Sequence, residues 1–170
     1  VRSSKLTSTA TGYKISTSDY GPSMGLCTSE PFYDQVTSAY CSGSLIGPDI
    51  IMTAGHCIRT ESSCKDTNFV FNFAYESAGA HPKTTLKDNV YGCKEIIHTE
   101  VNSSNSTDYA LIRLDRKVVG HNPIPVRQSG DIAKGEDLVV IGHPSGLPTK
   151  VAGGASVRDI SPAKYFIANL

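Results

Sequence analysis

No stretch of ten residues in this chain keeps its apolar side chains at the spacing of an amphipathic helix. Short runs rich in Val, Ile, Phe and Tyr alternate instead with Gly, Pro, Asn and Asp, which is typical of strands joined by turns. The clearest run is residues 69–75, where positions 69, 71, 73 and 75 are apolar. This pattern predicts an all-β sandwich or barrel.

The expected strands begin at residue 36 and continue to the end of the chain. They are residues 36–46, 50–53, 68–75, 90–99, 109–114, 137–142, 150–160 and 165–170. Residues 1–18 contain nine Ser or Thr and show no clear periodicity, so we expect an extended arm or a processed leader remnant rather than a folded unit. The polar stretch 120–125 carries two prolines and is the candidate linker between two β units.

Charge and hydropathy exclude two classes of partner. Lys and Arg total 16, as do Asp and Glu, so no net field attracts nucleic acid or an anionic membrane. No apolar run approaches the roughly 20 residues that a membrane helix needs. We therefore expect neither a nucleic-acid nor a membrane partner.

Cysteine usage indicates an oxidising compartment. The five cysteines, at positions 27, 41, 57, 64 and 93, form no Cys-x-x-Cys pair, which argues against a zinc ribbon or a thioredoxin-like motif. Their wide spacing favours disulfides, so we expect a secreted or periplasmic protein. The odd count leaves one cysteine without an internal partner and hints that the chain is incomplete. Because the other histidines, at 81, 98, 121 and 143, lack ligand spacing, we expect no metal and no cofactor.

The first candidate catalytic residue is His56. Residues 41–57 give a strand, a Gly-Pro-Asp turn, a second strand and small residues that lead to this histidine. A disulfide between Cys41 and Cys57 would join the two strands and fix the backbone beside the imidazole, stabilising the fold by about 3 kcal/mol. A general base must be held tightly, so such a brace suits catalysis. The alternative is a structural histidine beside a disulfide.

The second candidate is Asp108, at the start of the apolar run Asp-Tyr-Ala-Leu-Ile-Arg-Leu. A carboxylate at the mouth of such a strand would be substantially buried and would need a hydrogen-bond partner. The Nδ1–H group of His56 is such a partner. The alternatives are a strand-entry aspartate satisfied by nearby amides, or Asp115 as the functional carboxylate. Asp115 lies beside Arg116, however, and is expected to form an exposed charge pair with it.

Taken together, these motifs resemble the trypsin-like (chymotrypsin-fold) serine proteases. The resemblance covers roughly residues 35–170 and rests on Cys-Ser-Gly-Ser-Leu-Ile, Thr-Ala-Gly-His-Cys and the strand that begins at Asp108. Gly-His-Pro at 142–144 looks most like the bacterial branch that includes the glutamyl endopeptidases. The resemblance implies two six-stranded antiparallel β-barrels with the catalytic groups between them. His56 would be the general base and Asp108 the carboxylate that orients it.

The resemblance also implies how the chain is divided. Residues 1–34 would form an arm and lead-in, 35–120 the first barrel, and 121–170 the first part of the second. The family's nucleophile lies in a Gly-Asp/Asn-Ser-Gly loop that does not occur here, so the chain is expected to stop short of it. Ser145, in a loop, is not expected to replace it. The Gly-x-Ser-x-Gly pattern at 21–25 lacks the strand and helix that a nucleophile elbow needs.

The expected partners follow from that layout. They are a protein or peptide substrate and a second polypeptide, the C-terminal product of the same precursor, which would complete the second barrel. This chain alone is expected to be inactive. Cys64 is expected to pair with Cys93, leaving Cys27 for the second polypeptide, and Cys27–Cys64 is the rival pairing. Two other interpretations stay open. The protein could be a non-catalytic relative of these proteases that serves in binding or inhibition, or a disulfide-linked β module unrelated to proteases.

Overall fold

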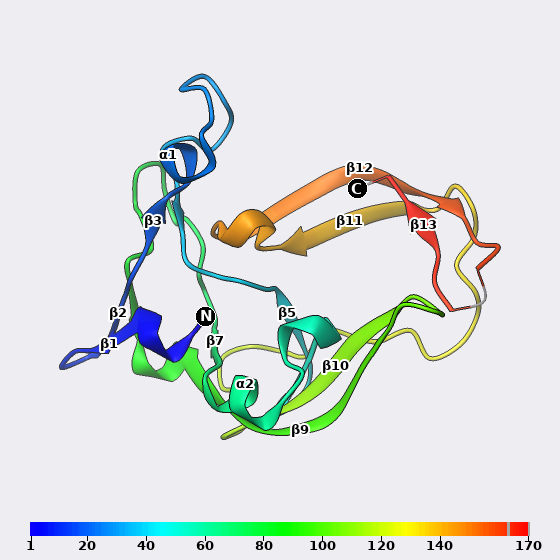
Figure 1. Cartoon of the computed structure of the whole chain (residues 1–170), viewed down its shortest axis with the longest axis horizontal. Coiled ribbons are helices and arrows are strands. Elements are labelled where there is room, and N and C mark those ends of the chain that lie inside the picture. The colour runs from blue at the N-terminus through cyan, green and yellow to red at the C-terminus, as the bar shows by residue number, and fades with distance from the viewer. Residues whose placement is uncertain (163, 170) are drawn as a thin grey trace.

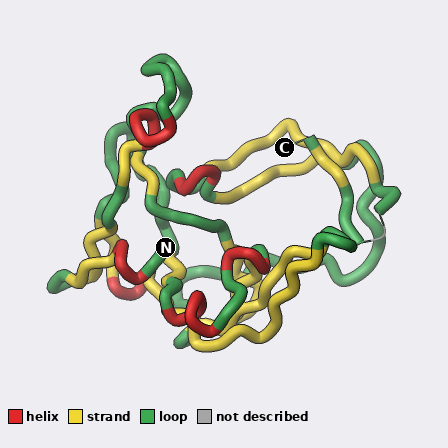
Figure 2. Tube along the Cα trace, viewed as in Figure 1, coloured by secondary structure: helices red, strands yellow, loops and turns green. Residues whose placement is uncertain are grey.

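A computed structural model describes residues 1–162 and 164–169 of the chain, and they are mostly β (Figures 1 and 2). The strands are β1 (Leu6–Ser8), β2 (Gly12–Ile15), β3 (Ser18–Asp19), β4 (Val36–Thr37), β5 (Gly43–Gly47), β6 (Ile50–Thr53), β7 (Asn68–Val70), β8 (Thr84–Leu86), β9 (Val90–Asn102), β10 (Thr107–Leu114), β11 (Asp137–Gly142), β12 (Lys150–Asp159) and β13 (Ile167–Ala168). The helices are short: α1 (Tyr20–Met24), α2 (Glu61–Lys65) and the 3-10 turns η1 (Ser3–Lys5), η2 (Gly55–Cys57), η3 (Lys87–Asn89) and η4 (Pro144–Gly146). Among the described residues, no helix has the length and hydropathy that crossing a membrane would require.

The main core is covered by a curled five-stranded antiparallel sheet, in the order β5-β6-β10-β9-β7. Strand β10 alternates as a half-buried strand should. Its inward side chains Ala110, Ile112 and Leu114 are at most 1 % exposed, whereas the intervening residues are less buried. Tyr91 of β9 and Ile58, which follows η2, fill the space that these side chains face.

The register of this sheet brings two distant segments together at one edge. Asp108 pairs with Val101 near the tip of the β9–β10 hairpin. Two residues further along β10, Ala110 pairs with Thr53, the last residue of β6. Because residues i and i+2 of a strand share a face, Asp108 lies on the same face as Ala110. The turn that follows β6 therefore begins beside Asp108.

A second, three-stranded sheet has the order β11-β12-β13 and lies apart from the first in Figure 1. Residues 115–136, which connect β10 to it, form no helix or strand, and the predicted linker 120–125 lies within them. One face of this sheet carries apolar side chains that are largely exposed. Val139, Ile141 and Val151 are 65 %, 64 % and 68 % exposed.

The N-terminal segment differs from the expectation of an arm without folded structure. Strands β1 and β2 form a hairpin, and β2 also pairs with β8, a strand that the sequence did not predict. Ile15 is 2 % exposed. In β2 only this residue and Gly12 are buried. The surrounding sequence is rich in Ser and Thr, so it shows no alternation of apolar and polar residues.

Several predicted strands have different bounds. The run 68–75 forms a strand only as far as Val70, because the chain turns at Asn72, whose φ is 59°. Phe73 beyond the turn is nevertheless 3 % exposed, so the alternation reflected burial rather than a continuous strand. The expected strand 36–46 is divided into β4 and β5. The last expected strand, 165–170, is reduced to β13, and residue 170 lies outside the described residues.

Candidate active site

His56 lies in the middle of η2, the tight turn that follows β6. The turn lies directly against the β9–β10 hairpin, and Gly55 makes this possible. A Cβ at Gly55 would be 2.4 Å from the backbone oxygen of Glu100 and 2.9 Å from that of Tyr109. Glycine before the histidine is therefore a packing requirement, and it brings the imidazole next to the start of β10.

His56 and Asp108 meet through two hydrogen bonds. The Nδ1 atom of His56 is 2.6 Å from Oδ2 of Asp108, and the backbone N–H of His56 donates to Oδ1 over 2.8 Å. Both carboxylate oxygens are used, so the ring and the backbone that carries it are fixed together. An ionised Asp108 accepts from Nδ1–H, which leaves the lone pair on Nε2. The hydrogen bond from the ring and that from the backbone hold the pKa of Asp108 below its usual value.

The pair is more open than the sequence suggested. The side chains of His56 and Asp108 are 55 % and 40 % exposed, so the expectation that Asp108 would be substantially buried is wrong. Asp108 is the first inward-facing residue of β10, at the rim of the sheet rather than over its core. None of the described residues covers it there.

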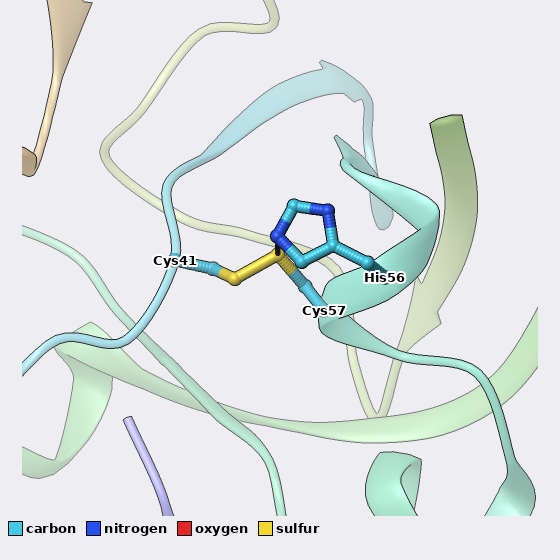
Figure 3. A group of neighbouring side chains, drawn as sticks. All are labelled: Cys41, His56 and Cys57. Carbon is cyan, nitrogen blue, oxygen red and sulfur yellow. Dashed lines mark hydrogen bonds between the residues drawn. A yellow bond between two sulfur atoms is a disulfide. The ribbon is translucent and has the colours of Figure 1, made fainter. Parts of the chain in front are cut away.

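Both disulfides have the pairing that the sequence favoured. Cys41 is bonded to Cys57, and Cys64 to Cys93. The second bond excludes the rival Cys27–Cys64, and Cys27 is exposed and unpaired. The first bond ties η2 to the segment before β5, directly beneath the imidazole (Figure 3).

The other nitrogen of His56 faces away from Asp108. Its neighbour is the Sγ atom of Cys57 at 3.6 Å (Figure 3). In the described part of the chain, no hydroxyl lies within hydrogen-bond distance of Nε2. Ser145, in η4, does not contact it, and Ser23 lies inside α1 rather than at a strand-to-helix turn. Asp115 accepts from Gly92 N–H and pairs with Arg116, so it has the structural role that was expected.

A seam between residues 38–42 and the turn after β11 was not visible in the sequence. Ser42 Oγ accepts from the backbone N–H of His143 over 2.8 Å. The backbone oxygen of Gly146 accepts from Ser38 and Ala39, at 3.0 and 3.3 Å. A Cβ at Gly146 would lie 2.3 Å from the oxygen of Ala39, so only glycine fits. The seam fixes the second sheet against the segment that carries Cys41.

A cavity that borders Cys41 and Cys57 is separate from the pair of His56 and Asp108. It has a volume of about 350 Å³, and residues of the curled sheet line it together with the end of β11 and the turn that follows. Phe69, Phe71 and Phe73 contribute to its apolar wall. Neither His56 nor Asp108 lines it. A group that reacts with Nε2 would therefore have to approach at the open rim of the sheet, not from this cavity.

Comparison with known proteins identifies the family. A family model described as "Trypsin-like peptidase domain" matches residues 41–167, most of the chain. This chain belongs to the trypsin-like peptidase domain family. The match begins at Cys41 and includes both His56 and Asp108 as well as the second sheet. No curated protein matches the chain.

Proposed function

We propose that this trypsin-like chain is the N-terminal part of a secreted or periplasmic serine endopeptidase, which hydrolyses peptide bonds of protein or peptide substrates through an acyl-enzyme. The observation that carries the proposal is the two-point contact of His56 with Asp108, which leaves Nε2 directed away from the carboxylate. Membership of a peptidase family makes protein the expected substrate. The two disulfides support an oxidising compartment.

In the proposed mechanism each residue has one role. The Nε2 atom of His56 takes the proton of a serine hydroxyl as the oxygen attacks the peptide carbonyl, and then donates it to the leaving amine. Asp108 keeps the Nδ1–H tautomer and stabilises the imidazolium. The Cys41–Cys57 bond limits movement of η2, so the imidazole stays in place through both steps.

The proposed layout has two barrels. The five-stranded sheet belongs to the first barrel, assigned to residues 35–120, and β11-β12-β13 begin the second, assigned to 121–170. Residues 1–34 lead into the first barrel. The exit of β11 at Gly142-His143-Pro144 supports the glutamyl-endopeptidase-like branch, although it implies no preference for Glu.

The nucleophile is proposed to come from a C-terminal segment or second polypeptide that completes the second barrel. Two observations support this. The apolar face of the second sheet, at Val139, Ile141 and Val151, is open and needs a cover. Among the described residues no hydroxyl reaches Nε2. Residues 1–170 alone are therefore proposed to be inactive, because they lack both the serine and the oxyanion donors, which are worth about 3–4 kcal/mol in related chemistry.

Hydrolysis of a peptide mixture tests the proposal. The protein as it is secreted should cleave peptides, its His56→Ala variant should not, and isolated residues 1–170 should not. Cleavage by residues 1–170 alone would contradict the proposed source of the nucleophile. A complete, folded protein that binds peptides without cleaving them would instead favour the alternative of a non-catalytic, protease-like binding protein.

A further inference from the structure

Three possible metal ligands converge beside the proposed catalytic pair. The Sγ atoms of Cys41 and Cys57 and a ring nitrogen of His56 all lie within 4.8 Å of one another (Figure 3). The two sulfurs are bonded to each other, so in this oxidised form they offer no thiolate to a metal. Reduction would turn both sulfurs into thiols that can bind an ion.

We propose that reduction of the Cys41–Cys57 disulfide converts this group into a binding site for Zn²⁺ or a similar ion. The ligands are the two thiolates and Nε2 of His56. A trialkylphosphine, with water, reduces the bond to two thiols and becomes the phosphine oxide. Binding of the ion then releases two protons, one from each thiol.

The distances fit a tetrahedral ion. Zn–S bonds of about 2.3 Å and Zn–N bonds of about 2.0–2.1 Å place a thiolate sulfur and an imidazole nitrogen about 3.6 Å apart. The Nε2 atom of His56 is already 3.6 Å from Sγ of Cys57. Two thiolates on the same ion would be about 3.8 Å apart. Rotation of the Cys41 side chain supplies that separation, since the two Cα atoms are 6.3 Å apart.

The surroundings also match those of a metal-binding histidine. Such a ligand usually donates its other ring N–H to a carboxylate, which fixes the tautomer and the ring orientation. Asp108 does this for His56 at 2.6 Å. Because His56 is half-exposed while Cys57 is 8 % exposed, an ion would enter from solvent over the imidazole, and water would fill its fourth position.

The consequence for activity depends on the proposed function, although the metal site itself does not. An ion on Nε2 occupies the lone pair that the proposed mechanism uses for proton transfer. The reduced, metal-loaded protein is therefore held inactive, and a chelator with reoxidation restores it. Before the disulfide forms, the same site would keep the protein inactive in a reducing compartment.

Cobalt(II) absorption tests the metal site independently of activity. The full chain carrying Cys27→Ser is reduced with phosphine, freed of excess reductant without oxygen, and titrated with Co²⁺. We expect a thiolate-to-cobalt charge-transfer band that saturates at one ion per chain and is displaced by Zn²⁺. The oxidised chain should show no band. Cys64→Ser/Cys93→Ser is the matched control, and it should retain the band because the other disulfide lies elsewhere.

Variants of the ligands complete the test. Asp108→Asn should weaken binding by about 10–100-fold, the usual effect of removing such a carboxylate, and His56→Ala should weaken it further. A band of equal affinity in His56→Ala, or no band in the reduced chain, would overturn the proposal. So would a circular dichroism spectrum showing that the metal-loaded chain is unfolded. A complete protein that binds Co²⁺ when reduced but cleaves no peptide when oxidised and metal-free would contradict the proposed function and leave the metal site standing.

Discussion

Two hydrogen bonds join His56 to Asp108, one from the ring and one from the backbone N–H. Each uses a different oxygen of the carboxylate. A carboxamide in its place could accept from only one of the two groups, and its NH₂ would oppose Nδ1–H. The imidazole would then change tautomer and present a proton, rather than a lone pair, at Nε2.

Asp108→Asn should therefore lower kcat of the complete enzyme by about 10⁴-fold, as removal of this carboxylate does in related chemistry. KM should change little, because Asp108 is not expected to contact substrate. Steady-state kinetics measures both. Asp115→Asn is the control, since Asp115 makes its hydrogen bonds to Gly92 and Arg116, and its kcat should be unchanged. Equal losses in the two variants would contradict the assignment.

The lowered pKa of Asp108 also predicts a pH dependence of stability. A carboxyl group whose pKa is lower in the folded state adds stability above its usual pKa of 3.8, and this stability is lost as the pH falls through the folded value. The difference in unfolding free energy between the wild-type chain and Asp108→Asn should thus shrink below about pH 4. Urea unfolding at a series of pH values checks this, and a difference that grows on acidification would contradict it.

At the scale of elements, η2 is held between two constraints: the disulfide on one side and the close approach of Gly55 to the β9–β10 hairpin on the other. Neither constraint touches substrate. Both fix the position of the imidazole. Removing either one should therefore lower the stability of the fold and displace the imidazole.

Gly55→Ala should destabilise the chain by about 1–3 kcal/mol, the usual cost of adding a methyl group to a packed site. The added Cβ would be 2.4 Å from the oxygen of Glu100, and backbone cannot move aside as a side chain can. Gly153→Ala is the matched control, because nothing lies within 4 Å of its Cβ position. Denaturant unfolding measures both, and similar midpoints would show that η2 is not confined by the hairpin.

Loss of the brace beneath His56 should be larger. Replacing Cys41 and Cys57 by serine should cost about 2–5 kcal/mol, the usual effect of removing a native disulfide from a small secreted domain. Differential scanning calorimetry of the double variant checks this. A melting temperature equal to that of the wild-type chain would mean that the rest of the fold already holds these segments.

The sequence was informative about elements whose signal is local. The β-type runs and the two motifs that carry His56 and Asp108 are each short contiguous patterns. The Cys64–Cys93 pairing was only preferred over Cys27–Cys64, because it joins residues 29 positions apart. The seam between Ser42 and His143 joins residues 101 positions apart through a backbone N–H, so no side-chain pattern marks it. The hairpin β1–β2 was missed because pairing with β8, rather than its own polar sequence, holds it in the fold.

For the whole molecule, the second sheet is the part with the most exposed apolar side chains. Its apolar face is open where the five-stranded sheet instead encloses a core. The seam through Gly146 and Ser42 holds the two sheets in one arrangement, so whatever covers the second sheet is also placed relative to His56. The proposed serine segment would have to meet both requirements.

Isolated residues 1–170 should therefore associate or bind hydrophobic dyes, since Val139, Ile141 and Val151 are each more than half exposed. Light scattering after size exclusion measures the association. Replacing Val139 and Val151 by threonine should reduce it while keeping the strands, because threonine is β-branched. A monomer that excludes the dye would contradict the need for a cover.

Labelling with a fluorophosphonate probe tests the central claim most directly, because the probe reacts only with a serine activated by a neighbouring base. In the complete secreted protein, mass spectrometry should find the label on one serine from outside residues 1–170, and labelling should disappear in His56→Ala. Absence of label from the folded protein, or label that persists in His56→Ala, would contradict the account.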